Sequence, residues 1–233
     1  METRKIASNL DTNFLKLAAL VCMTFDHVGS NFFPDMPLFR IIGRLAFPIF
    51  AYCVVVGCLY THDVKRYALR LGAFALLSQP IYALPGCESL AEYWERLIWS
   101  PNIFFTLLVG LAAVYGLKEK KWWLTVAAVL FSAFVNVDYG AYGVILMVLF
   151  FLLRSKRWQS CLVVALYLGM DLIDLPRWPY IAALQGFSLL SLPLIYAHTN
   201  VGIKVNKYVF YAYYPAHLLA IFLIQRLLGL AVA

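Results

Sequence analysis

Residues 13–33 read NFLKLAALVCMTFDHVGSNFF, an apolar run long enough to cross a bilayer that nevertheless carries Lys16, Asp26 and His27. An ionised side chain at mid-bilayer costs at least about 2.5–3.5 kcal/mol on insertion scales, so such residues usually face a polar interior and mark function. Lys16 precedes His27 by eleven residues, close to three full helical turns. We therefore expect both side chains on one face of a helix, about 16 Å apart along its axis.

The composition of the whole chain is typical of a membrane protein. Its 233 residues are 63% hydrophobic and only 13% charged, with a mean hydropathy of +0.78. We predict a single polytopic domain over residues 1–233, an all-α bundle of membrane-spanning helices. The net charge of +7 lies in short clusters between apolar runs, which indicates membrane topology rather than nucleic-acid binding. The five cysteines form no CxxC pair and no cluster with histidine, so we expect no metal site.

Nine apolar stretches, separated by charged or Pro/Gly-rich breaks, are each predicted to cross the bilayer. They are 14–33, 41–60, 68–84, 102–117, 122–137, 140–153, 159–175, 180–197 and 208–229. Several are shorter than the roughly 20 residues of a standard transmembrane helix. Between the third and fourth stretches, the amphipathic and mildly acidic segment 86–101 is a candidate for an interfacial helix.

The distribution of basic residues predicts the orientation of these spans. If the N-terminus is cytoplasmic, every even-numbered junction is basic and the odd-numbered junctions carry few cations. The cytoplasmic cations are then Arg4, Lys5, Lys16, Lys65, Arg66, Arg70, Lys118, Lys120, Lys121, Arg154, Lys156, Arg157, Lys204 and Lys207. This alternation predicts an N-in, C-out topology.

Asp26 and His27 are the first candidates for a catalytic site. A neutral imidazole is the side chain best suited to take and return a proton near pH 7, and a carboxylate can orient it or stabilise its charged form. Adjacent residues on a helix point about 100° apart, so Asp26 is free to serve another partner, for which Arg44 is the candidate. The alternative interpretation is a structural ion pair without a catalytic role.

Arg40 and Arg44 open the second span at i, i+4 spacing, which places them on one helix face. Guanidinium groups suit an anionic ligand, a carboxylate or a developing oxyanion. The alternative is that both side chains reach toward lipid headgroups, an explanation that fits Arg40 better than Arg44. Pro48 follows and is predicted to kink this helix.

Polar residues further along the chain have two interpretations. Lys65, Arg66 and Arg70 form a cytoplasmic basic segment that either signals topology or holds the phosphates of a cytosolic cofactor. Gln79 and Asn102 lie near span ends, and we expect them to form hydrogen bonds between helices.

The last span carries a polar stripe. Tyr211, Tyr214 and His217 recur at i, i+3 and i+6, so they share a helix face. Tyrosine near a membrane surface ordinarily belongs to an interfacial belt. His217 lies about ten residues inside the span, too deep for such a belt, and it is therefore a second site candidate.

Six segments in order carry a resemblance to a known family. They are LKLAALVCMTFDHVG (15–29), FRIIGRLAFPIFAY (39–52), KRYALRLGAFALLSQPIY (65–82), NIFFTLLVGL (102–111), DYGAYG (138–143) and KYVFYAYYPAHLL (207–219). In this order they resemble the TraX family, membrane proteins linked to N-terminal acetylation of conjugative pilin. That family in turn looks like a distant part of the transmembrane acyltransferase superfamily.

The resemblance implies roles for particular residues. The superfamily places ten residues between a basic residue and a first-span histidine, which maps onto Lys16 and His27. It implies acetyl-CoA arriving from the cytosol, an acceptor on the other side of the bacterial inner membrane, and His27 as general base. Arg40 and Arg44 stand where the superfamily has closely spaced arginines before a proline, although the spacing differs.

Together these observations predict an acetyl-CoA-dependent membrane acetyltransferase that acts on an amine or hydroxyl of a protein N-terminus or an envelope glycan. His27, Asp26 and Arg44 are the predicted catalytic residues. The predicted contacts to acetyl-CoA are Lys16, Arg40, Lys65, Arg66, Arg70, Tyr214 and His217. A small proton-coupled transporter that uses Asp26, His27 and Arg44 as a relay is the alternative. A noncatalytic assembly factor is the third hypothesis.

Overall fold

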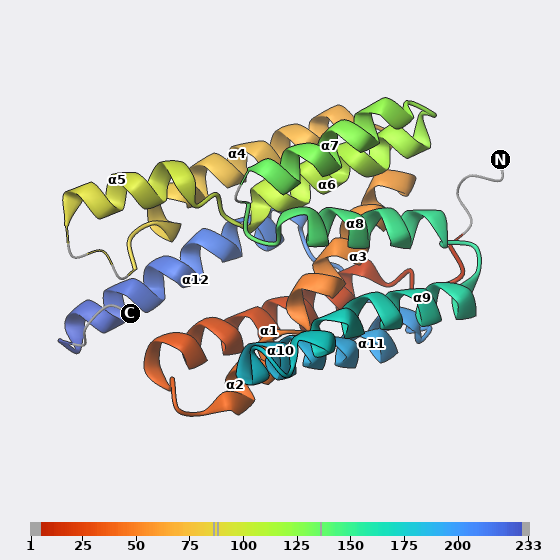
Figure 1. Ribbon diagram of the computed structural model, residues 1–233. Coiled ribbons are helices and arrows are strands. Elements are labelled where there is room, and N and C mark those ends of the chain that lie inside the picture. Colours follow the sequence, from red (N-terminus) through yellow and green to blue (C-terminus); the bar gives the residue numbers. More distant parts are fainter. Residues whose placement is uncertain (1–5, 86, 88, 136, 230–233) are drawn as a thin grey trace. The chain divides into compact units, whose positions relative to one another are not determined.

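The computed structural model describes residues 6–85, 87, 89–135 and 137–229, and within these ranges helices are the regular secondary structure and strands are absent. The helices in chain order are α1 (Thr12–Phe32), α2 (Pro37–Gly43), α3 (Ala46–Tyr60), α4 (Val64–Tyr82), α5 (Leu90–Trp99), α6 (Ile103–Lys118), α7 (Trp122–Phe134), α8 (Gly140–Leu152), α9 (Arg157–Gly169), η2 (Met170–Asp174), α10 (Pro179–Gly186), η3 (Phe187–Ser191), α11 (Leu192–Tyr196) and α12 (Lys207–Leu227) (Figure 1). The all-α prediction is confirmed for this part of the chain. Arg4 and Lys5, which the topology prediction uses, lie outside it.

Four helical stretches are long and apolar enough to cross a membrane: Pro37–Tyr60, Leu90–Lys118, Pro179–Tyr196 and Lys207–Leu227. Helices α7 and α8 are apolar but shorter. Helix α1 is not among the four, because Lys16, Asp26, His27 and its other polar residues lower its hydropathy. The membrane assignment therefore stands, while the count of nine spans stays a prediction.

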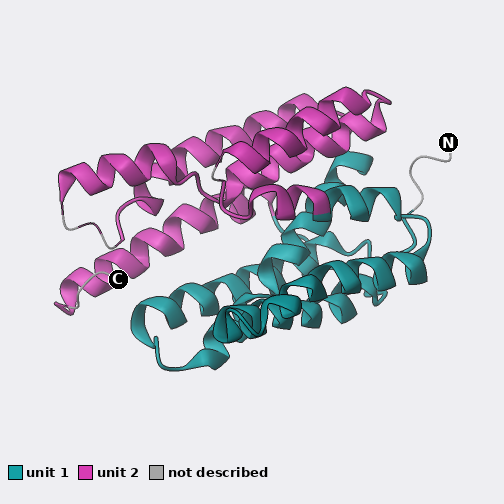
Figure 2. Ribbon diagram, in the orientation of Figure 1, with its two compact units in different colours: residues 1–60, 146–205 teal, residues 61–145, 206–233 magenta. Residues whose placement is uncertain are grey.

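The chain folds into two compact units, each built from two separate stretches of sequence. Unit 1 comprises residues 1–60 and 146–205, and unit 2 comprises residues 61–145 and 206–233 (Figure 2). The boundaries fall between α3 and α4, within α8, and just before α12. The prediction of one domain over the whole chain stays a prediction.

In unit 1, the segment before α1 is fixed by long-range hydrogen bonds. Asn9 is fully buried, and its amide nitrogen donates to the carbonyl of Leu194 (3.0 Å) and to the hydroxyl of Thr199 (2.9 Å). The Tyr52 hydroxyl on α3 donates to the backbone carbonyl of Asn9 at 2.7 Å. Asp11 then caps the first turn of α1. The start of α1 is thus tied both to α3 and to the segment around α11.

The second predicted span, 41–60, is two helices rather than one kinked helix. Helix α2 ends at Gly43 and α3 begins at Ala46, so the break lies at Arg44 and Leu45. The disruption expected from Pro48 is present as this break one turn earlier, because Pro48 has no N–H for the carbonyl of Arg44. In the first turn of a helix the N–H that proline lacks has no intrahelical partner to lose.

The last two spans before α12 are also divided. The predicted stretch 159–175 is α9 followed by the 3₁₀ helix η2. The predicted stretch 180–197 is α10, η3 and α11 in succession. Short 3₁₀ segments of this kind keep the chain helical while changing the hydrogen-bond pattern, and a hydrophobicity pattern alone does not reveal them.

In unit 2, a buried amide network joins α4 to the start of α6. The oxygen of the Gln79 side chain accepts from the backbone N–H of Asn102 (2.9 Å) and from its side-chain nitrogen (2.7 Å). The Gln79 nitrogen donates to the carbonyls of Leu97 (3.2 Å) and Ser100 (2.9 Å). Asn102 also donates to the carbonyl of Ala75 at 2.8 Å. The interhelical bonds predicted for Gln79 and Asn102 are confirmed.

We predict that Asn102→Ala lowers the free energy of unfolding by about 2–4 kcal/mol, because it removes the buried side-chain hydrogen bonds to Gln79 and Ala75 and the cap on the N–H of Phe104. The measurement is thermal unfolding of the full chain in detergent. Asn200→Ala is the matched control, since Asn200 is exposed. Equal melting temperatures for the two variants would contradict the prediction.

Candidate functional site

The Asp26 carboxylate on α1 is held by two arginines from the following helix and its end. Arg44 Nη2 lies 2.8 Å from Oδ1 and 3.0 Å from Oδ2 of Asp26. Arg40 Nη1 lies 3.0 Å from Oδ2. The side chains of Asp26 and Arg44 are 17% and 14% exposed, and that of Arg40 is 28% exposed. The predicted Asp26–Arg44 pair is confirmed, and Arg40 joins it.

A third element of unit 1 also contacts Arg44. Its other terminal nitrogen, Nη1, donates to the side-chain oxygen of Gln185 on α10 at 3.0 Å. The guanidinium plane is therefore fixed from two directions, by a carboxylate and by an amide. The sequence analysis did not identify Gln185. Its only signal was an amide within an apolar stretch, which does not reveal a distant partner.

Two glycines allow α1 and α2 to come this close. A Cβ at Gly43 would overlap the Asp26 side chain, and a Cβ at Gly29 would overlap Phe39. Both glycines are buried. The side chain of Asp26 therefore lies against the backbone of α2 at Gly43. Gly43 is next to Arg44 in the sequence and three residues after Arg40. The sequence analysis did not identify Gly29 or Gly43 as close-contact positions. The sequence pattern that could have indicated them is a glycine in each of two consecutive helices.

His27 and Lys16 lie on α1 as predicted, and α1 is one uninterrupted helix. Both residues are half-buried. The backbone carbonyl of His27 accepts from the side chains of Asn31 (2.7 Å) and Ser30 (3.1 Å). Because adjacent helical residues point about 100° apart, the His27 ring projects from a different side of α1 than Asp26. Asp26 therefore anchors the helix that carries His27.

The basic segment at the start of α4 lies in unit 2. Lys65 and Arg66 are exposed, and Arg66 pairs with Asp63 at 3.0 Å in a solvent-facing ion pair. Arg70 is half-buried and lies close to the Tyr211 side chain of α12. Arg70 therefore has a structural partner, while Lys65 and Arg66 face outward.

Tyr214 and His217 lie on one buried face of α12, as the spacing predicts, at 4% and 8% exposure. The Tyr214 ring meets Phe104 of α6 edge to face at 5.2 Å, and its centroid lies 5.6 Å from that of His217. Nδ1 of His217 lies 2.9 Å from the Tyr213 carbonyl one turn earlier. Both side chains are part of the packing among α4, α6 and α12.

The predicted site residues are divided between the two units. Unit 1 contains Lys16, Asp26, His27, Arg40 and Arg44, of which Asp26, Arg40 and Arg44 are in direct contact. Unit 2 contains Lys65, Arg66, Arg70, Tyr214 and His217. Over the residues that the structure describes, no group of three or more His, Cys, Asp or Glu side chains is arranged to hold a metal ion.

Comparison with known families assigns the chain. The sequence model of the TraX protein family matches residues 11–225, nearly the whole chain. The chain belongs to the TraX family. The matched range includes α1, α2 and α10, so the Asp26 cluster lies entirely within the family region. No solved structure matches the chain.

Curated relatives of this TraX family member come from several bacteria. A probable fimbrial assembly protein FimC, serogroup H1, of Dichelobacter nodosus is 25% identical over 224 residues, 88% of this chain and 91% of the relative. An uncharacterized protein of Rickettsia prowazekii is 23% identical over 176 residues, 70% of this chain and 65% of that protein. Protein TraX of Escherichia coli K12 is 26% identical over 140 residues, 58% of this chain and 53% of that protein.

We predict that Gly43→Ala destabilises the protein by about 1–3 kcal/mol, because its Cβ forces α2 away from Asp26. Gly169→Ala is the matched control, since a Cβ there has nothing within 4 Å. The check is thermal unfolding of both variants in the same detergent. Equal stability of the two variants would mean that α1 and α2 separate without loss.

We also predict that Arg44→Leu destabilises the chain more than Arg40→Leu. Arg44 is the less exposed of the two and holds both Asp26 and Gln185. Breaking a well-buried ion pair costs about 3–5 kcal/mol, while exposed pairs contribute up to about 1 kcal/mol. For these partly exposed pairs we expect a loss of about 2 kcal/mol for Arg44→Leu and below about 1 kcal/mol for Arg40→Leu. Denaturant unfolding measures both, and the reverse order would contradict the prediction.

Proposed function

We propose that this TraX family member is an integral-membrane acetyltransferase that uses cytosolic acetyl-CoA and has His27 as its general base. The observation that carries the proposal is the Asp26–Arg44–Gln185 cluster, one residue along α1 from His27, in a chain with helices long and apolar enough to span a membrane. The side chains of Asp26 and Arg44 are each less than one-fifth exposed, so the free energy lost on removing their charges from water has to be offset by strong interactions between them. Their arrangement fixes the segment of α1 that carries the imidazole, which supports a site.

In the proposed reaction, the acceptor is a primary amine or a hydroxyl. Its nitrogen or oxygen attacks the thioester carbon of acetyl-CoA, a C–N or C–O bond forms, and the C–S bond breaks. His27 takes the proton that the acceptor loses and delivers it to the departing thiolate of coenzyme A. Arg44, held by Asp26 and Gln185, supplies a positive group for the oxyanion that develops during attack.

For the donor side we propose the N-in, C-out arrangement of nine spans in the bacterial inner membrane. In this topology Lys16 and the start of α4 lie toward the cytosol. The exposed Lys65 and Arg66 are then placed to meet the phosphates of acetyl-CoA. Arg70, Tyr214 and His217 are further proposed contacts to acetyl-CoA. Arg40 is proposed to contact acetyl-CoA as well as Asp26.

For the acceptor we propose the N-terminus of a pilus or fimbrial subunit, or an envelope glycan. One relative is named as a probable fimbrial assembly protein, which favours the protein acceptor. A free α-amino group has a pKa near 8, so a large share is protonated at neutral pH. A base such as a neutral histidine is therefore useful for this reaction.

We predict that His27→Ala abolishes acetyl transfer, with a loss of at least about 10²-fold in kcat, the lower end of general-base contributions. The assay uses purified chain in liposomes, radiolabelled acetyl-CoA and a peptide with a free N-terminus. His62→Ala and His198→Ala are the matched controls, because both histidines are exposed. Circular dichroism and gel filtration verify that each variant is folded.

Three outcomes would count against the proposal. Full transfer by His27→Ala would remove the base assignment. Proton or solute flux without any labelled product would favour the transporter, in which Asp26, His27 and Arg44 act as a relay. Neither flux nor label, in a chain still needed for fimbrial assembly by its host, would indicate a noncatalytic assembly factor.

A further inference from the structure

We propose that α5 lies flat in the membrane–water interface, with one apolar stripe inserted among lipid headgroups and upper acyl chains. This inference is independent of the acetyltransferase proposal, because it concerns the position of a helix rather than a reaction. The partner is the bilayer itself. The stripe consists of Leu90, Trp94 and Ile98.

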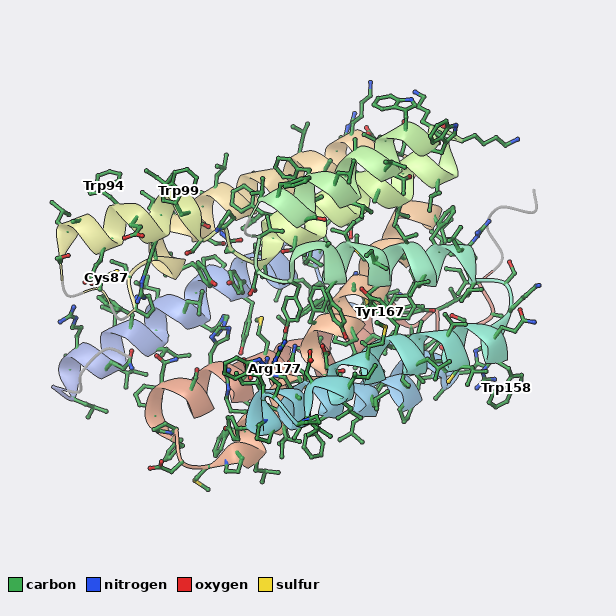
Figure 3. The ribbon with its side chains drawn as sticks, in the orientation of Figure 1. Cys87, Trp94, Trp99, Trp158, Tyr167 and Arg177 are labelled. Carbon is green, nitrogen blue, oxygen red and sulfur yellow. The ribbon has the colours of Figure 1, made fainter. Side chains whose placement is uncertain are left out.

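The stripe is exposed along the whole helix. Leu90, Trp94 and Ile98 follow each other at i, i+4 and i+8, and they are 72%, 53% and 60% exposed. Each step of four residues turns the helix by about 40° beyond a full turn, so the three side chains share one face. No residue of α5 is buried. Trp94 and Trp99 both project away from α12 in Figure 3.

The opposite side of α5 is charged. Glu92, Glu95 and Arg96 are exposed, and Arg96 donates to the carbonyl of Pro85 in the preceding loop. Around the helix, Glu92 lies about 120° and Glu95 about 60° from Ile98 at the nearer edge of the stripe. An exposed apolar face that carries a tryptophan, opposite a charged face, is typical of a helix that rests in the interface.

The attachment of α5 to the rest of unit 2 leaves the stripe uncovered. The side chain of Gln79 donates to the carbonyls of Leu97 and Ser100, at the end of α5. These bonds hold the helix by its backbone at one end, next to the buried Asn102. They neither involve nor cover Leu90, Trp94 and Ile98.

The alternative is that α5 and α6 form one long span. The stretch Leu90–Lys118 has 29 residues, and as a single helix it would be about 44 Å long, against about 30 Å of hydrocarbon. The helix is interrupted at residues 100–102. Pro101 has no N–H to donate, and the N–H of Asn102 bonds the Gln79 side chain instead of a helical carbonyl.

The experiment measures the depth of single tryptophans in the full chain reconstituted in vesicles. All six tryptophans are more than half exposed, so replacing five by Phe and keeping Trp94 leaves the core and the native cysteines untouched. The matched variant carries Trp94→Phe and Glu95→Trp, which moves the probe to the charged face. Quenching is measured with lipids brominated near the headgroup or near the methyl end, and with aqueous acrylamide.

We expect headgroup-proximal bromine to quench Trp94 several-fold more than the probe at position 95, and acrylamide to show the reverse preference. Moving the probe through positions 90–98 should make lipid quenching oscillate with the helical period. Quenching that deepens steadily along these positions would identify a spanning helix and overturn the inference. Equal acrylamide access on both faces, or protection of Trp94 from both quenchers, would overturn it as well.

Discussion

The contact of Asp26 with Arg44 depends on how closely α1 and α2 approach, and the rest of the candidate site depends on that contact. Gly43 gives the carboxylate room, because any side chain there would occupy the position of Asp26. The helix then breaks at Arg44, so one terminal nitrogen meets Asp26 while the other meets Gln185. A partly buried charge pair is stable only when such geometry is precise, since desolvation opposes it. The glycine, the break and the ion pair therefore form one structural unit.

Helical periodicity was enough to predict the parts of this unit that lie close in sequence. The 100° offset between neighbouring residues separated Asp26 from His27 and pointed to Arg44 as the partner. The i, i+3, i+6 spacing placed Tyr214 and His217 on one buried face of α12. Both conclusions hold because α1 and α12 are uninterrupted helices, in which sequence spacing translates directly into direction.

Prediction failed where tertiary contacts decide the backbone. Pro48 accounts for the helix break one turn before it, at Arg44, but it does not reveal that the Arg44 guanidinium group is held from two sides. Gln185 lies 141 positions away from Arg44, and no local pattern links the two. Asn9 is similar, since its bonds to Leu194 and Thr199 join segments without regular periodicity. Long-range hydrogen bonds between irregular segments leave no trace in hydrophobicity.

The polar networks around Gln79 and around Asp26 differ in a way that distinguishes scaffold from candidate site. The Gln79 amide makes all four of its hydrogen bonds, to Asn102, Leu97 and Ser100, and is almost fully buried. A neutral, satisfied and sealed network can fix helices but has no remaining capacity for a ligand. The cluster around Asp26 is charged, its side chains are 14–28% exposed, and the half-buried His27 is the next residue along α1. Placing charged groups inside an apolar bundle costs desolvation free energy, which offsets much of the attraction between them. A role for the cluster in binding and polarising a reacting group would explain why the chain carries that cost.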